Sequence, residues 1–101
     1  MRLVALAHMG TSGEISAWNC SVSKGVVGRW DVTLDNPATS ELNIVPIVSG
    51  ESTTAAANAI VCNTLVQSAT AIVVWRRLTG SNPTFNDGDC YLAVFDAGLP
   101  G

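Results

Sequence analysis

The chain has few of the side chains that carry out acid–base or nucleophilic chemistry. It contains one histidine, His8, and three cysteines, Cys20, Cys62 and Cys90. A nucleophile needs a base within reach and a third group that orients that base. His8 lies in an apolar N-terminal run beside Met9, where a packed, hydrogen-bonded imidazole is far commoner than a catalytic one. The sequence therefore predicts no catalytic residues and no enzyme.

The three cysteines are odd in number, widely spaced and without a Cys-x-x-Cys pair. A disulfide scaffold or a zinc site would need an even or clustered set. We therefore expect Cys20, Cys62 and Cys90 to be buried free thiols in a reducing cytosol.

Two carboxylates, Asp87 and Asp89, lie two positions apart in a stretch rich in turn-forming residues. Paired carboxylates can hydrolyse glycosidic bonds, and residues 86–89 also resemble part of a calcium loop. The stretch lacks the later bidentate Glu that completes such a loop. We expect it to cap a turn, with no metal and no cofactor.

The charge pattern excludes two classes of partner. The net charge is −3, and the five basic residues are Arg2, Lys24, Arg29, Arg76 and Arg77. Binding to nucleic acid or to anionic lipid needs a basic face that neutralises several phosphates. The adjacent pair Arg76 and Arg77 would face opposite sides of a strand, so it cannot form one patch. We expect neither nucleic acid nor a membrane as a partner.

The N-terminal apolar run before His8 is shorter than the 7–15 residues of a signal-peptide core. No segment approaches the eighteen apolar residues of a membrane span. We interpret the run as a first strand.

Composition indicates that the molecule has covered surfaces. Hydrophobic residues make up 48% of the 101 residues and charged residues 13%, against the usual ~25% charged. A single domain of this size, residues 1–101, has a thin stability margin by itself. We expect other copies of the chain to cover part of its surface.

Beta-forming and turn-forming residues alternate along the whole chain, which predicts seven or eight short strands. The expected strands are residues 2–8, 14–23 (with a bulge or break near Ala17), 29–34, 42–48, 59–66, 69–78 and 89–96. Residues 29–34 alternate most cleanly, and Pro46 favours an edge position or a bulge. Gln67 and Ser68 suit a tight turn between two strands.

This pattern predicts an all-β fold, either an antiparallel β-sandwich or a jelly-roll-like barrel. A helix across residues 52–65 is the main competing interpretation, although its Thr, Val and Asn content disfavours it.

The large aromatic side chains and the arginine pair are the candidates for contacts with partners. These interface candidates are Trp18, Trp30, Trp75, Arg76, Arg77, Tyr91 and Phe95. Trp30, Trp75, Tyr91 and Phe95 fall within expected strands and suit the core or an interface. Trp18 is the tryptophan most suited to an exposed, sugar-stacking position, although a core position is favoured for it.

Three segments together resemble a known module. They are Gly13-Glu-Ile-Ser-Ala-Trp-Asn-Cys-Ser-Val22, the stretch Gly25…Gly28-Arg-Trp-Asp-Val-Thr-Leu34, and Asp89-Cys-Tyr-Leu-Ala-Val-Phe95. This chain resembles a β-module that recurs in tailed-phage fibres and other virion surface proteins. The strand pattern is also similar to that of C1q- and TNF-like trimers. The resemblance implies a compact β-sandwich that trimerises on a capsid or tail, and it implies no enzymatic residues.

We therefore expect a structural component of a phage virion surface, made in the host cytoplasm. It would be a capsid decoration (cement) protein or a head- or tail-fibre protein. It would assemble as a homo-oligomer, with a trimer favoured, and dock on major capsid or tail proteins. The alternative is a tip module of a fibre that binds a receptor or a host-surface glycan. That module would use exposed aromatics and the loops 49–58 and 79–88.

Overall fold

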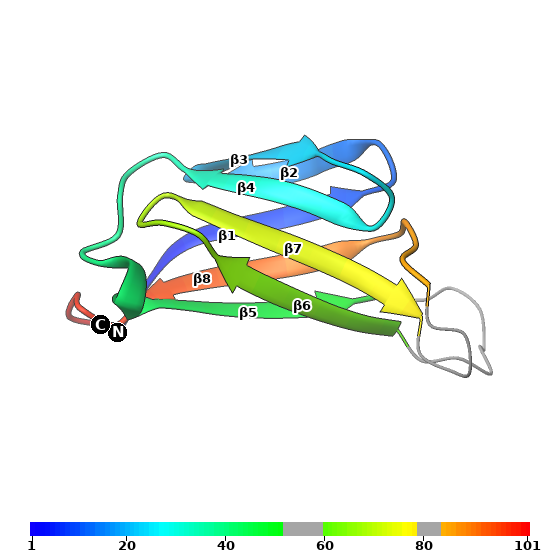
Figure 1. Cartoon of the computed structure of the whole chain (residues 1–101). Helices are drawn as coiled ribbons and strands as arrows, with labels where there is room; N and C mark the ends of the chain where they lie inside the picture. The colour runs from blue at the N-terminus through cyan, green and yellow to red at the C-terminus, as the bar shows by residue number, and fades with distance from the viewer. Residues whose placement is uncertain (52–59, 79–83) are drawn as a thin grey trace.

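A computed structural model describes residues 1–51, 60–78 and 84–101. In this part of the chain, two four-stranded antiparallel sheets pack face to face (Figure 1). The first sheet has the order β2 (Gly13–Trp18), β1 (Arg2–Gly10), β8 (Cys90–Asp96) and β5 (Ile44–Gly50). The second has the order β3 (Cys20–Lys24), β4 (Arg29–Leu34), β7 (Ala71–Leu78) and β6 (Ile60–Val66). A short 3-10 helix, Glu41–Asn43, precedes β5.

The predicted all-β fold is confirmed. The sequence left open a β-sandwich or a jelly-roll-like barrel, and two separate four-stranded sheets match the sandwich. β5 lies at a sheet edge. An edge strand has one unpaired side, so it tolerates Pro46, which has no N–H to donate. The competing helix over 52–65 is wrong for residues 60–65, which lie in β6, and residues 52–59 are outside the described part. None of the described residues belongs to a helix of the length and apolarity that a bilayer crossing requires.

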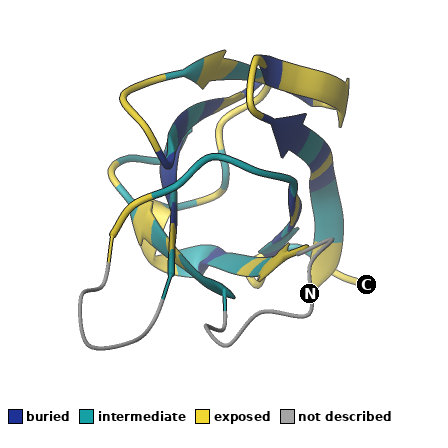
Figure 2. Ribbon diagram, turned by 90° about the vertical axis from the view of Figure 1, so that its right-hand side faces the viewer, coloured by how far each residue is buried: buried dark blue, intermediate teal, exposed yellow. Residues whose placement is uncertain are grey.

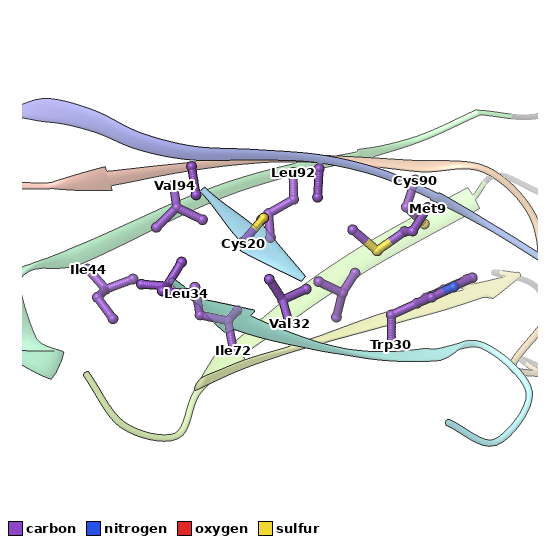
Figure 3. Close-up of a cluster of buried hydrophobic side chains, with 13 residues drawn as sticks. Met9, Cys20, Trp30, Val32, Leu34, Ile44, Ile72, Cys90, Leu92 and Val94 are labelled. Atoms are coloured by element: carbon purple, nitrogen blue, oxygen red, sulfur yellow. The ribbon is translucent and has the colours of Figure 1, made fainter. Parts of the chain in front are cut away.

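The core consists of side chains from alternate positions of facing strands, because successive residues of a strand point to opposite faces. In β4, Trp30, Val32 and Leu34 are buried, as their predicted alternation requires. Figure 3 shows these side chains meeting Met9, Cys90, Leu92 and Val94 from the other sheet. In Figure 2 the strands accordingly carry alternating buried and exposed bands.

The chain changes sheets within residues 14–23, where a bulge or break was predicted near Ala17. The break lies at Asn19, whose φ of 58° turns the chain from β2 in the first sheet to β3 in the second. Asparagine tolerates this left-handed conformation better than most residues. A bulge also occurs, because His8 pairs with Ser16 and Met9 with Glu14, which leaves Ile15 as the extra residue.

The turn between β6 and β7 is longer than the predicted Gln67-Ser68 turn. β7 begins at Ala71, so residues 67–70 form the connection. The Gln67 N–H donates to the Ala71 carbonyl at 2.9 Å, and the Ser68 hydroxyl accepts from the Thr70 N–H at 3.2 Å. Gln-Ser does not supply the positive φ that a two-residue turn favours, and the extra residues remove that requirement.

Asp96 at the end of β8 is a buried carboxylate, 1% exposed, that fixes the segment before β5. It accepts hydrogen bonds from the Thr39 N–H and hydroxyl, both at 2.7 Å, and from the Gly98 N–H at 2.9 Å. Donors to the ionised form stabilise it, so these bonds hold the pKa of Asp96 below its usual value.

Asp96→Asn is expected to lower the midpoint of thermal unfolding by about 5 °C or more, because its amide cannot accept all three bonds. The depressed folded pKa also fixes the pH dependence. The stabilisation from Asp96 is complete above the unfolded pKa of about 3.9 and is lost as the pH falls through the folded pKa. Thermal melts between about pH 2 and 7 should therefore show a steeper acid loss for the parent protein than for the variant. Parallel curves would contradict this role for Asp96.

Candidate interaction surface

The outward face of the first sheet is a continuous uncharged surface. Strand register places Leu6 and His8 of β1 beside Trp18 and Ser16 of β2. On the other side, Tyr91 of β8 pairs with His8 and with Ser49 of β5. We call this surface the outer face and define it by Leu6, His8, Ser16, Trp18, Ile47, Ser49, Tyr91 and Ala93.

The outer face is hollowed rather than flat. An open depression of about 610 Å³ is lined by residues of all four strands, and its lining contains no Asp, Glu, Lys or Arg. Four large side chains of this lining are substantially exposed: Leu6 (43%), Trp18 (48%), Ile47 (57%) and Tyr91 (40%). Single exposed apolar residues are ordinary, but a contiguous apolar surface marks an interaction site.

An aromatic stack stiffens one part of the outer face. The rings of His8 and Tyr91 lie 4.3 Å apart between centroids, with 17° between their planes. The Tyr91 hydroxyl donates to Glu51 Oε2 at 2.8 Å, which raises the pKa of Tyr91. His8 Nε2 lies 3.4 Å from Asp89 Oδ2, which makes an ion pair when the imidazole is protonated. The two carboxylates therefore hold the ring pair in place from the rim.

The outward face of the second sheet has a different chemistry. Arg29 and Asp31 form an ion pair at 3.0 Å, and the Arg29 guanidinium lies 5.2 Å from the centre of the Trp75 ring. Trp75 is half-buried and packs against Phe85, with their ring centroids 5.0 Å apart. The exposed Arg77 neighbours Trp75 on β7. Arg29, Asp31 and Arg77 make this the more highly charged of the two faces.

The structure separates the predicted interface residues into three places. Trp18 and Tyr91 share the outer face, and the half-buried Phe95 lies on the same side of β8, two residues beyond Ala93. Trp75 and Arg77 belong to the second sheet. The prediction that favoured a core position for Trp18 is wrong. Trp18 follows the bulge at Ile15 in an edge strand, and its side chain points outward.

Two predicted interface residues cannot contact a partner through their side chains. Trp30 is 0% exposed, and its indole N–H donates to the Gly10 carbonyl at 2.9 Å, so Trp30 is a core residue. Arg76 is 3% exposed and donates to the Glu51 carbonyl at 2.7 Å and the Asp87 carbonyl at 2.8 Å. As the strand period requires, Arg76 and Arg77 face opposite sides.

Among the members of the outer face that sequence reasoning missed, the three largest are Leu6, His8 and Ile47. Leu6 and His8 alternate in β1 with the buried Ala5, Ala7 and Met9. The alternation can be read from the sequence. It does not show which face is the core, because small alanines occupy inward positions and larger residues occupy the outward ones. Ile47 follows from the same period in β5, between the inward Pro46 and Val48.

The two carboxylates singled out in the sequence have separate partners. Asp87 Oδ1 accepts from the Gly28 N–H at 2.8 Å and forms an ion pair with Lys24 at 2.9 Å. Burial opposes ionisation of Asp87, but these donors outweigh it and lower its pKa. Asp89 instead faces His8. Among the described residues, no three His, Cys, Asp or Glu side chains gather as a metal site would need.

The outer face thus has the chemistry of a binding surface. It offers apolar area, a fixed aromatic stack and carboxylates only at its rim. No protein-family model, no curated protein and no solved structure matches this chain.

Proposed function

We propose that this chain is a structural component of a phage virion surface that assembles with copies of itself through the outer face. One observation carries the proposal: large apolar side chains from all four strands of one sheet are exposed side by side, with no charged residue in the hollow they line. Water contact with such a surface is unfavourable, at roughly 25 cal/mol per Å² of apolar area. Association that covers it is therefore stabilising.

A second copy of the chain is the occupant that this surface favours. A charged partner surface would lose its hydration against the hollow without gaining an opposite charge there. The same uncharged face on another copy carries no such cost, whether the copies are related by a two-fold or a three-fold axis. The low charge of the whole chain, 13% of its residues, agrees with repeated contacts between copies.

The size of the outer face supports many modest contacts rather than one strong contact. Four strands about 4.8 Å apart and a longest strand of nine residues give a patch of roughly 19 by 30 Å. That is less than the ~800 Å² per partner of a standard stable interface. Symmetric repetition on a capsid or tail strengthens such contacts through multivalency. The segmental resemblance to virion modules, with a trimer favoured, supports the same function, as a decoration or fibre protein docked on major capsid or tail proteins.

The test uses a matched pair of leucines. Leu6→Lys places a charge in the outer face, where Leu6 is 43% exposed. Leu65→Lys places one on β6 of the second sheet, where Leu65 is 55% exposed. An unpaired charge buried in an interface costs about 3 kcal/mol or more, so Leu6→Lys should weaken self-association by about 100-fold or more. Leu65→Lys should leave it unchanged.

Native mass from light scattering on a sizing column, over a range of protein concentrations, measures this association. A parent protein that stays monomeric at high concentration would contradict self-assembly through this face. Dissociation by Leu65→Lys alone would place the contact on the other sheet. For the virion role, particles lacking this protein are expected to fall apart at lower temperature than complete particles.

A second function, binding of a receptor or host-surface glycan, has one observation in its favour. Trp18 and the stacked His8–Tyr91 pair present aromatic surface in a hollow with Glu51 and Asp89 at its rim. Sugars stack their apolar faces on aromatic rings and donate hydroxyls to carboxylates. Addition of oligosaccharides should then quench Trp fluorescence in the parent protein and not in Trp18→Ala. No response across a broad set of glycans would contradict this function.

A further inference from the structure

Two cysteines from different sheets meet inside the sandwich. Cys62 of β6 and Cys90 of β8 are 28 positions apart in the chain, and their sulfur atoms lie 3.6 Å apart. Both are free thiols; Cys90 is fully buried and Cys62 is half-buried. The sulfurs need to approach by about 1.5 Å to reach a disulfide bond length. The pair therefore stands close to bonding distance without any rearrangement of the strand order.

A glycine makes this approach across the sandwich feasible. Gly50 of β5 pairs with Cys90 in the first sheet. A Cβ at position 50 would stand 2.7 Å from the sulfur of Cys62 and 2.6 Å from Cγ2 of Ile60. A larger residue at this point would force the side chains of Cys62 and Ile60 to move. Gly50 thus leaves the space through which the Cys62 side chain reaches Cys90.

The surroundings give the two thiols different roles. A hydrogen bond from the Cys90 thiol lowers the pKa of Cys62 and, together with the positive charge of Arg76, outweighs the opposing effect of burial. The same hydrogen bond and burial raise the pKa of Cys90. Thiolates, not thiols, attack disulfides and peroxides. Cys62, the more accessible of the two, is therefore the attacking sulfur, and Cys90 is the second thiol that resolves the intermediate.

Cys20 provides an internal contrast. It is buried, its thiol donates to the Leu6 carbonyl at 3.3 Å, and burial raises its pKa. Cys62 and Cys90 contact each other, whereas the Cys20 thiol bonds to a backbone carbonyl and to neither of the other two cysteines in the described part of the chain. Cys20 therefore serves as an unreactive control.

We infer that Cys62 and Cys90 form a reversible disulfide that joins the two sheets, with a low-molecular-weight disulfide as the oxidant. The Cys62 thiolate attacks one sulfur of the oxidant, forms a mixed disulfide and releases one small thiolate. Cys90 then gives up its proton, and its sulfur attacks Cys62, forms the Cys62–Cys90 bond and releases the second small thiolate. The protein dithiol loses two electrons and two protons, and the oxidant gains them as two thiols.

The cross-link would stabilise the sandwich by constraining the unfolded chain. It connects positions 28 residues apart and ties β6, an edge strand of the second sheet, to an inner strand of the first. By the loop-length dependence of disulfide stabilisation, the midpoint of thermal unfolding should rise by roughly 10 °C or more. Such a protein would be assembled in a reduced form and strengthened when it meets an oxidising environment.

The experiment treats the folded protein with oxidised glutathione and maps its peptides by mass spectrometry without reduction. The expected product is an intact monomer that is two mass units lighter, with peptides containing Cys62 and Cys90 joined. Cys20→Ala should give the same product. Cys62→Ala should give no internal cross-link. Cys90→Ala should stop at glutathione bound to Cys62, and should reach it more slowly because the hydrogen bond that lowers the Cys62 pKa is lost. Reduction by dithiothreitol should restore the starting mass and the lower unfolding midpoint.

Three results would overturn the inference. These are a glutathione adduct on Cys62 that persists in the parent protein, a cross-link that involves Cys20, and a bond between chains in place of the internal one. Cys90 is buried, so Cys90→Ala could lower stability; Cys62→Ser, at the half-buried position, then gives an independent check on the same cross-link. Self-association through the outer face is measured separately, so either proposal can fail without the other.

Discussion

Replacing Trp30 by alanine is expected to lower the free energy of unfolding by about 4 kcal/mol, the cost of a large cavity in a packed core. Trp30 is fully buried, where the two sheets meet, and its indole N–H satisfies the Gly10 carbonyl at the end of β1. Alanine would remove both the ring and that hydrogen bond. Domains of this size are stable by only about 5–15 kcal/mol, so much of the protein should unfold on mild heating.

Urea unfolding followed by circular dichroism measures the loss, and two variants separate its causes. Trp30→Phe retains most of the apolar ring but leaves the Gly10 carbonyl without its donor, so we expect a smaller loss of about 2 kcal/mol. Trp18→Ala makes the same chemical change at an outward position that is 48% exposed, and it should cost less than about 1 kcal/mol. Equal losses for Trp18→Ala and Trp30→Ala would contradict the assignment of one residue to the surface and the other to the core.

These two tryptophans show what a sequence pattern can and cannot predict about side-chain position. The regular alternation around Trp30 in residues 29–34 determines both the strand and its buried side. Trp18 follows a bulge at Ile15, and a single extra residue moves every later side chain to the opposite face. A pattern that contains a bulge cannot by itself show which side of the bulge keeps the original register. The sandwich was therefore predictable, whereas the outward position of Trp18 was not.

Contacts between segments distant in the chain escaped prediction for another reason. The sequence predicts only separate buried thiols at Cys62 and Cys90, because nothing in their spacing shows that side chains of β6 and β8 meet inside the sandwich. That proximity depends on the strand order of both sheets and on the space left at Gly50. The outer face depends on strand order in the same way, since its members come from four strands. Local patterns indicate strands and their faces, and the order of the strands decides which faces meet.

Arg76 is the second residue whose replacement should have a large effect. It points into the sandwich from β7, and its guanidinium donates to the carbonyls of Glu51, just after β5, and of Asp87, just before β8. A Cβ at Gly88 would overlap the guanidinium, so a larger residue there would force the Arg76 side chain to move. Arg76 thus connects three segments of the two sheets at the same end of the sandwich as Cys62 and Cys90.

Arg76→Met, which keeps an unbranched, largely apolar side chain but is shorter and has no donors, is expected to destabilise the protein by about 2–4 kcal/mol. The carbonyls of Glu51 and Asp87 would lose their partners. Arg77→Met is a matched control on the same strand: Arg77 is exposed, so its replacement should change stability by less than about 0.5 kcal/mol. Arg76→Lys should fall between the two, since a compact ammonium retains the charge but cannot span both carbonyls as the planar guanidinium does. The measurement is the urea concentration at the midpoint of unfolding for each of the three variants. If Arg76→Met and Arg77→Met unfold at the same midpoint, the buried guanidinium does not hold these segments together, and packing alone joins the two sheets at this end.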